Sequence, residues 1–252
     1  MAVAHDGARQ PSLVLDAGTG IRHVTDLCAG EAFRGTVLLS HLHWDHTQGL
    51  PFFAAGDRPD ARVVVGVPAQ GDGVGPVELF ARAMSPPHFP IDPTGLRGDW
   101  AFEWVDPGWR TFEGFEVLAL EVPHKGGRTF GYRVSDGRST LAYIPDHGPL
   151  ACGPGDDGLG ELHRAALDLC AAADLVIHDA QHTAEELPAR AHFGHSAAEY
   201  AVRLAETAGA RHVLLFHHDP NRTDEAMDAM ATRFSARSVL VSTAVEGDVY
   251  PV

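Results

Sequence analysis

The six-residue segment HLHWDH, residues 41–46, constrains this chain more than any other feature. It follows the apolar and β-branched run TVLLS, which predicts a buried strand over residues 36–40. Three imidazoles and one carboxylate therefore stand where a strand ends, and side chains at such a turn can converge on one point instead of alternating across a sheet. Imidazole and carboxylate groups without a thiolate suit Zn, Mn or Fe. The segment predicts a metal site of the catalytic kind.

The overall composition narrows the class of protein. The chain has 252 residues, of which 16 are histidine, and its 19 basic and 34 acidic side chains give a formal net charge of −15. This acidity argues against a protein that binds nucleic acid through the phosphate backbone, because such proteins need clustered lysine and arginine. With 44% hydrophobic residues the chain can bury a core. We expect a single domain that spans residues 1–252.

Cysteine usage and hydropathy indicate the compartment. Cys28, Cys152 and Cys170 are widely spaced and form no C-x-x-C pair, so we expect neither a disulfide framework nor a cysteine zinc site. No segment approaches the length of about 18 apolar residues that a membrane span requires, and residues 1–10 lack the pattern of a signal peptide. These features predict a cytoplasmic protein without a membrane span.

Hydrophobic patterning predicts an α/β chain that begins with strands and continues with alternating helices and strands. The best-specified helix covers residues 196–208, where Ser196 and Glu199 predict a capping box and Gly209 a stop. The Pro/Gly-rich segment 85–98 is too long for a simple connection. The expected strands cover residues 12–16, 36–40, 62–67, 116–122, 130–134, 140–144, 174–178, 211–216 and 238–241, and the other expected helices cover 159–173 and 223–234.

Five sequence blocks carry a resemblance to a known superfamily. HxHxDH after a strand, preceded by DAGTG at residues 16–20, resembles the metallo-β-lactamase fold hydrolases. HKGGRTFGYRV at 124–134, LAYIPDH at 141–147 and the stretch from HDAQH to HHDP at 178–220 match in the same order. Within the superfamily these blocks are most similar to the ribonuclease Z-like phosphodiesterases. The resemblance implies a four-layer αββα sandwich of two mixed β-sheets with a dinuclear metal site at one edge.

The same resemblance implies a set of metal ligands. His41, His43 and His124 would hold one ion, Asp45, His46 and His217 would hold the other, and Asp146 would bridge them. The expected cofactors are two divalent ions, Zn or alternatively Mn or Fe. Such a pair brings the pKa of a bound water near neutrality and stabilises the attacking and leaving oxygens of an in-line displacement. Asp45 is also expected to orient the attacking oxygen.

His195 is the expected catalytic residue beside the ligands. It precedes Ser196 at the position of the family's H-S/T motif, which contacts the scissile phosphate and assists the leaving group. Alternatively, His195 is a hydrophobic-staple or surface histidine next to the start of the helix. Asp179 is expected to pair with it, and Asp16 is expected to orient a ligating histidine. His147 is a candidate for the pocket wall and His88, in the loop over 85–98, for a substrate contact.

The chain also departs from the ribonuclease Z-like pattern. Asp16 is reached after fifteen residues, which is early for this family, so we expect a shortened N-terminal hairpin or a start upstream. An exposed sheet edge would result, and association into a homodimer is one way to cover it. The long basic arm with which ribonuclease Z holds tRNA has no counterpart in the sequence.

Three functions of different classes follow from these features. The first is a dinuclear metal-dependent phosphodiesterase acting on small diesters such as cyclic nucleotides, favoured by GGRTFGYR after His124 and by His195. The second is a glyoxalase II-like thioesterase or lactonase, but HKGGRTFGY departs from the H-T-P-G-H type motif of that group. The third is a non-catalytic binding module, which the filled ligand positions disfavour. A ribonuclease Z-like RNA-processing nuclease is a further alternative, against which stand the missing arm and the net charge of −15.

Overall fold

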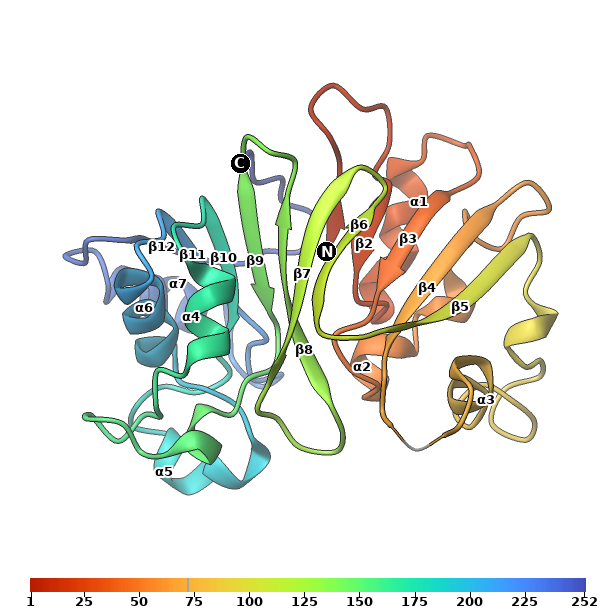
Figure 1. The fold of residues 1–252 in the computed structure, drawn as a ribbon. Helices are drawn as coiled ribbons and strands as arrows, with labels where there is room; N and C mark the ends of the chain where they lie inside the picture. Colours follow the sequence, from red (N-terminus) through yellow and green to blue (C-terminus); the bar gives the residue numbers. More distant parts are fainter. Residues whose placement is uncertain (72) are drawn as a thin grey trace. The chain divides into compact units, whose positions relative to one another are not determined.

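A computed structural model describes residues 1–71 and 73–252 of the chain. These residues divide into two units, each with its own sheet and its own hydrophobic core (Figure 1). Unit 1 comprises residues 1–106 and 112–114, and unit 2 comprises residues 107–111 and 115–252. Two mixed β-sheets with helices confirm the α/β class that the patterning predicts.

Unit 1 contains, within the described residues, a five-stranded sheet in the order β1-β2-β3-β4-β5. Strands β2 to β5 are parallel, whereas β1 pairs with β2 in the antiparallel sense. Because β2 and β3 are parallel, their carboxyl ends meet at one edge of the sheet, and Asp16 and Ser40 follow there. The elements are β1 (Ala2–Val3), β2 (Leu13–Leu15), β3 (Arg34–Leu38), β4 (Arg62–Pro68), β5 (Asp99–Val105), α1 (Val24–Leu27), α2 (Trp44–Thr47) and α3 (Pro76–Ala81).

The DAGTG and HLHWDH segments lie close together at the edge of the unit 1 core. Val37 and Val65 are fully buried between the strands and the helices, as their β-branched side chains favour. The Ala17 N–H donates to the His46 carbonyl oxygen at 2.8 Å. A Cβ on Gly18 would lie 2.1 Å from the Asp45 carbonyl oxygen, so this close approach of the two backbones requires glycine.

Unit 2 contains, in the described part of the chain, a seven-stranded sheet in the order β12-β11-β10-β9-β8-β7-β6. Strands β9 to β12 are parallel, and β8 is antiparallel to both β7 and β9. Strands β7, β9, β10 and β11 therefore end at the same edge. The elements are β6 (Gly108–Phe112), β7 (Phe115–Val122), β8 (Thr129–Ser135), β9 (Thr140–Ile144), β10 (Leu175–Asp179), β11 (His212–Phe216), β12 (Leu240–Thr243), α4 (Arg164–Cys170), α5 (Leu187–Arg190), α6 (Ala198–Thr207) and α7 (Asp224–Thr232).

Helix α6 forms where it was expected, but its predicted capping box is wrong. The N-cap is Ala197, and the Ser196 hydroxyl donates instead to the Asp179 carbonyl oxygen at 2.6 Å. Glu199 Oε2 accepts from the Ala184 N–H at 2.8 Å. Both side chains are thus used for tertiary hydrogen bonds rather than for the local cap. Gly209, with φ +70°, follows the C-cap as predicted.

Other boundaries also differ from the sequence predictions. The helix expected over 159–173 is shortened to α4, because Gly160 adopts φ +124° and cannot continue a helix. Strands β5 and β6 were not predicted, although β5 extends the first sheet beside β4. Strand β1 has two residues and pairs with β2, and a homodimer at that edge stays a prediction.

Cys28, Cys152 and Cys170 are all free thiols. Among residues 1–71 and 73–252, no helix combines the length and the apolar character that a membrane span requires.

Candidate functional site

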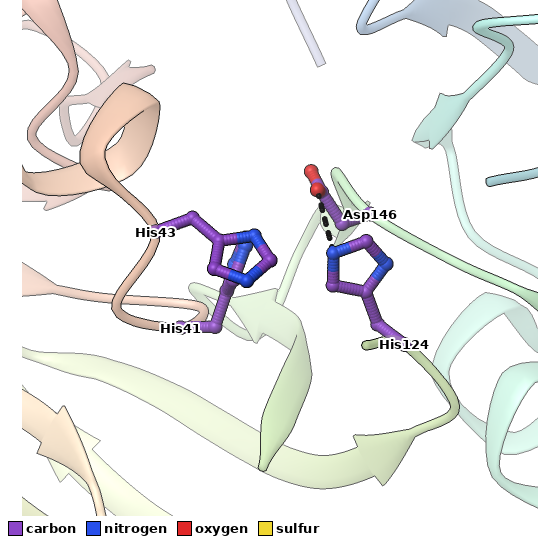
Figure 2. Close-up of side chains that lie close together, drawn as sticks. All are labelled: His41, His43, His124 and Asp146. Carbon is purple, nitrogen blue, oxygen red and sulfur yellow. Dashed lines mark ion pairs between the residues drawn. The ribbon is translucent and has the colours of Figure 1, made fainter. Parts of the chain in front are cut away.

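The three histidines and the aspartate of HLHWDH, whose side chains carry atoms that can bind a metal ion, form one cluster in unit 1. After β3 the chain turns into α2, with His43 as its N-cap in an extended conformation. The ring centroid of His41 lies 4.4 Å from that of His43 and 4.3 Å from that of His46. Asp45 Oδ2 lies 3.3 Å from His46 Nε2. We call His41, His43, Asp45 and His46 the unit 1 cluster; Figure 2 shows its first two imidazoles side by side.

Asp16 and Ser40 orient two of these rings. Asp16 Oδ2 accepts from His46 Nδ1 at 2.7 Å and from the Ser40 hydroxyl at 2.8 Å. Since the only hydroxyl proton of Ser40 is donated to Asp16, its Oγ, 3.0 Å from His41 Nδ1, accepts a hydrogen bond from that ring. His41 and His46 therefore carry their protons on Nδ1 and present an Nε2 lone pair, as metal-binding imidazoles do.

Asp16 is well suited to this orienting role. It is 7% exposed and adopts φ +61°, a left-handed conformation that aspartate and asparagine tolerate better than most residues. Burial favours the neutral acid, but the electrostatic attraction and hydrogen bond of the His46 Nδ1–H outweigh it and lower the pKa of Asp16. The side chain is thus held as a carboxylate against His46, in agreement with the expectation from the sequence.

Asp16→Asn should weaken metal binding by roughly 10- to 100-fold, the usual loss when an outer hydrogen-bond partner of a ligating histidine is removed. Asparagine keeps the size of the side chain and tolerates the left-handed backbone, so the lost carboxylate is the main change. Calorimetric titration of metal-free protein with Zn²⁺ measures the affinity. Asp57→Asn, which removes a carboxylate bound to Arg97 in the same unit, is the matched control. Equal affinities of both variants would contradict the orienting role.

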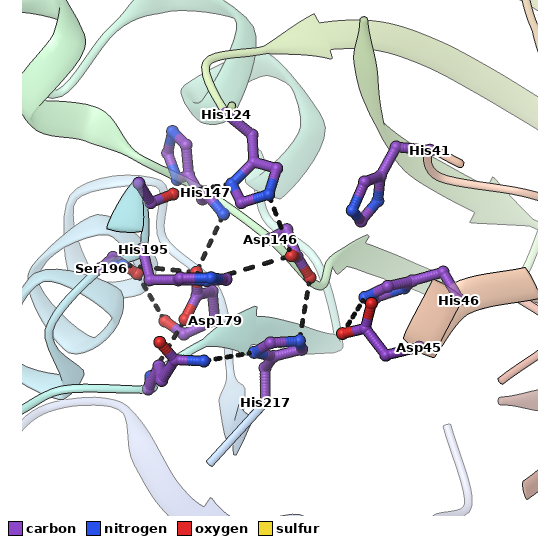
Figure 3. A network of polar contacts seen from close by, with 12 residues as sticks. His41, Asp45, His46, His124, Asp146, His147, Asp179, His195, Ser196 and His217 are labelled. Carbon is purple, nitrogen blue, oxygen red and sulfur yellow. Dashed lines mark hydrogen bonds and ion pairs between the residues drawn. The ribbon is translucent and has the colours of Figure 1, made fainter. Parts of the chain in front are cut away.

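A second cluster lies at the strand ends of unit 2. His124 follows β7, Asp146 follows β9 and His217 follows β11, so the shared edge of the sheet gathers them. Asp146 Oδ2 lies 3.3 Å from His124 Nε2, and Asp146 Oδ1 lies 3.4 Å from His217 Nε2 (Figures 2 and 3). One buried carboxylate thus faces two imidazoles with two different oxygens. We call His124, Asp146 and His217 the unit 2 cluster.

The rings of the unit 2 cluster are also oriented through Nδ1. His124 Nδ1 donates to the Gly194 carbonyl oxygen at 2.7 Å. The side-chain amide nitrogen of Gln181, Nε2, lies 3.2 Å from His217 Nδ1; turning this amide over would place its oxygen there as an acceptor. His217 adopts φ +55°, a strained conformation for histidine that turns its ring out of the strand direction. His124 Nε2 and His217 Nε2 both face oxygens of Asp146.

His195 lies beside the unit 2 cluster, bound to Asp179 as expected. Its Nδ1 donates to Asp179 Oδ2 at 2.9 Å, and its ring stacks on that of His217 with centroids 4.9 Å apart and 16° between the planes (Figure 3). The fully buried Asp179 also accepts from the His147 N–H at 2.9 Å. Donor atoms of Asp146, His195 and His217 all lie within 4.8 Å of one another. The ring of His195 is therefore close enough to act on a group bound at this edge.

His147 is fully buried, so the prediction that it lines a pocket is wrong. Its Nδ1 lies 2.9 Å from His178 Nε2, and its Nε2 lies 2.7 Å from His163 Nε2. His178 Nδ1 in turn donates to the Asp179 carbonyl oxygen at 2.8 Å. Burial first, and then the rings of His178 and His163, lower the pKa of His147 well below its ordinary value. This network of neutral rings supports Asp179 from inside the unit.

Sequence reasoning missed three groups that hold the candidate ligands. Ser40 directly precedes HLHWDH and Gln181 lies within HDAQH, so both could have been suspected from their neighbours. The third group is the Gly194 carbonyl oxygen, for which no side-chain pattern exists. His88 is exposed in the loop over 85–98, and its contact with substrate stays a prediction.

The donor atoms of both clusters suit a divalent cation. The unit 1 cluster offers three imidazoles and a carboxylate, and the unit 2 cluster offers two imidazoles and a carboxylate. Neither contains a thiolate, and hard carboxylate with borderline imidazole ligands fits Zn, Mn or Fe. Three of the five imidazoles, those of His41, His46 and His124, have acceptors at Nδ1 that leave Nε2 for the metal, which is the outer arrangement typical of histidine ligands.

Comparisons with known proteins agree with this geometry. Residues 13–218 match the family model described as Beta-lactamase superfamily domain. The chain is 40% identical over 57 residues to a Ribonuclease Z of Thermoplasma volcanium, covering 23% of this chain and 19% of that protein. It is 32% identical over 96 residues to a Ribonuclease Z of Brevibacillus brevis, covering 38% of this chain and 29% of that protein.

A solved structure is similar over nearly the whole fold. A diphosphatase from the PhnP family has a TM-score of 0.66 and 18% sequence identity, and the match covers 98% of this chain and 80% of that one. The curated ribonucleases, by contrast, are matched over less than a third of their length. The family model extends from the strand before Asp16 to the residue after His217 and thus covers most of the chain. The chain therefore belongs to the family described as Beta-lactamase superfamily domain.

Proposed function

We propose that this chain is a dinuclear metal-dependent phosphodiesterase that acts on small phosphodiesters such as cyclic nucleotides. The observation that carries the proposal is the arrangement of Asp146, whose two oxygens lie 3.3 and 3.4 Å from two different imidazoles. A carboxylate in this position suits a ligand that contacts two ions. The His195 and Asp179 pair lies on the same sheet edge and supplies a proton donor.

The two clusters are proposed to complete one centre, because neither offers enough donors alone for two ions with about four ligands each. The ligands would be His41, His43 and His124 for one ion, Asp45, His46 and His217 for the other, and Asp146 for both. We propose Zn, with Mn or Fe as alternatives. The two units would then act as one hydrolase domain over residues 1–252.

When bound, two divalent ions supply an activated water at neutral pH and stabilise negative charge on phosphoryl oxygens. Asp45, whose side chain is 57% exposed next to His46, can accept a proton from the attacking water and orient it. His195 in its imidazolium form presents an Nε2–H that can be donated to the leaving oxygen. Asp179 holds the other nitrogen of that ring and so fixes its direction.

Phosphoryl substrates are favoured over thioesters and lactones by this set of donors. His195 and the proposed ions all stabilise charge on phosphoryl and leaving oxygens. Among similar proteins are two named Ribonuclease Z and one named a diphosphatase, names that denote phosphoryl chemistry. A small diester is proposed rather than RNA, because a net charge of −15 opposes binding of a polyanion.

Metal-reconstituted protein should hydrolyse bis-p-nitrophenyl phosphate and cyclic nucleotides with a higher kcat/KM than a thioester and a lactone. Initial rates measured over one substrate panel with Zn²⁺, Mn²⁺ and Fe²⁺ check this expectation. Protein treated with a chelator is the control and should lose the activity. Efficient thioester or lactone turnover without diester turnover under any of these metals would instead support the glyoxalase II-like alternative.

A further inference from the structure

Lys125 is the single lysine of the chain, and every other basic side chain among the 19 is an arginine. It directly follows His124, a proposed metal ligand, and lies in the loop between β7 and β8. A sequence that uses guanidinium groups everywhere else therefore has its one lysine directly after a proposed metal ligand. This position calls for a role that differs from the structural roles of the arginines.

The stem of Lys125 packs against the residue that precedes His195. A Cβ on Gly194 would lie 3.0 Å from Lys125 Cγ and 3.5 Å from His124 Nδ1. The Gly194 carbonyl oxygen also accepts the His124 Nδ1 proton at 2.7 Å, which binds the two loops together. The ring centroids of His124 and His195 are 4.9 Å apart. The lysine side chain thus starts between a proposed ligand and the proposed proton donor, all within unit 2.

Lys125 differs from the arginines of unit 2 in its exposure and its contacts. Lys125 is exposed, and no hydrogen-bond or ion-pair partner binds its ammonium among the residues that the structure describes. In the same unit Arg133 donates to the Ala171 carbonyl oxygen, Arg203 pairs with Asp157 and Arg222 pairs with Glu186. Those cations hold the fold together, whereas Lys125 contributes no such contact. In a chain of net charge −15, a local cation offsets the repulsion of an anionic substrate.

We propose that the Lys125 ammonium binds an anionic oxygen of the substrate and thereby selects phosphodiesters over neutral esters. The inference rests on the proposed phosphodiesterase function. An ammonium is a compact charge on a flexible stem, so it can reach a single phosphate oxygen without the planar, two-point geometry that arginine prefers. That oxygen belongs either to the scissile phosphoryl group or to a second phosphate on the same substrate. Lys125 is in both cases a specificity-determining residue, and His195 remains the proton donor.

The kinetic test uses two matched p-nitrophenyl nucleotide diesters, one of which carries a second, methyl-esterified phosphate on the sugar, so that the two substrates bear one and two negative charges. Lys125→Met should raise KM for the doubly charged diester about 10-fold, the size expected for one hydrogen bond to a charged group, while kcat changes less than about 2-fold. An equal rise for the singly charged diester places the ammonium on the scissile phosphoryl group. A rise confined to the doubly charged diester places it on the second phosphate.

Three comparisons make this test specific. Lys125→Arg should recover part of the lost affinity, because it keeps the charge but changes its shape. Arg138→Met removes an exposed cation from the turn between β8 and β9, and should leave KM unchanged. High salt should shrink the effect of Lys125→Met, because exposed charges are screened. An unchanged KM for both diesters in Lys125→Met would overturn the proposal.

A second measurement does not depend on turnover. Reductive methylation with ¹³C-formaldehyde labels amines and preserves their charge, and a chain with one lysine yields one lysine side-chain signal beside that of the terminal amine. Adding inorganic phosphate to the metal-loaded protein should shift the Lys125 resonance. A shift in a protein that hydrolyses no diester would support the anion contact and reject only the phosphodiesterase proposal. An unshifted resonance would overturn the anion contact itself.

Discussion

Replacing His195 with alanine should lower kcat by roughly 10² to 10⁴-fold while both metal ions stay bound. The side chain has one nitrogen held by Asp179 at 2.9 Å, and its ring stacks on His217. In the proposed mechanism this ring donates a proton to a leaving oxygen, an interaction that strengthens only as charge develops there. KM should change less than kcat for the same reason. Steady-state kinetics together with elemental analysis of the purified variant measure both quantities.

The metal content distinguishes this role from that of a ligand. Donor atoms of Asp146, His195 and His217 lie within 4.8 Å of one another, so a ligand role for His195 would show as the loss of an ion. His192→Ala, which removes an exposed imidazole three residues earlier in the same loop, is the matched control and should keep full activity. Full metal content with an unchanged kcat in His195→Ala would leave His195 as a staple residue at the start of α6.

Asp146→Ala should remove both metal ions and reduce hydrolysis to the background rate. Its two oxygens lie 3.3 Å from His124 Nε2 and 3.4 Å from His217 Nε2, so one substitution takes a donor from both proposed ions. The loss of affinity should exceed the about 10- to 100-fold that follows removal of an outer hydrogen-bond partner. Elemental analysis after reconstitution and dialysis against a weak chelator gives the number of ions per chain.

His217→Ala provides the comparison for Asp146→Ala. This residue is assigned to one ion, so its removal should weaken one ion and spare the other. Circular dichroism and thermal unfolding of both variants establish that the fold is retained. Two ions bound at full affinity in Asp146→Ala would contradict the bridging assignment, even if the variant were inactive.

The sequence alone was sufficient to predict the features that depend on neighbouring residues. His41, His43, Asp45 and His46 lie within six positions after a strand, and a turn at that point brings their side chains together with little help from the rest of the chain. The ends of the strands could also be predicted from the sequence, because runs of β-branched residues stop where polar residues such as Asp146 begin. The α/β class and the family followed from the order of these segments.

Only the tertiary structure decided which atoms hold these groups in place. The carbonyl oxygen of Gly194 accepts from His124, 70 residues away, and a backbone oxygen leaves no pattern in a sequence. Ser196 and Glu199 match a capping box locally, yet both side chains bind partners on other segments. Local patterns therefore predict elements and clusters, whereas burial and long-range hydrogen bonds, which come from packing of distant segments, determine ring orientation and the use of each polar side chain.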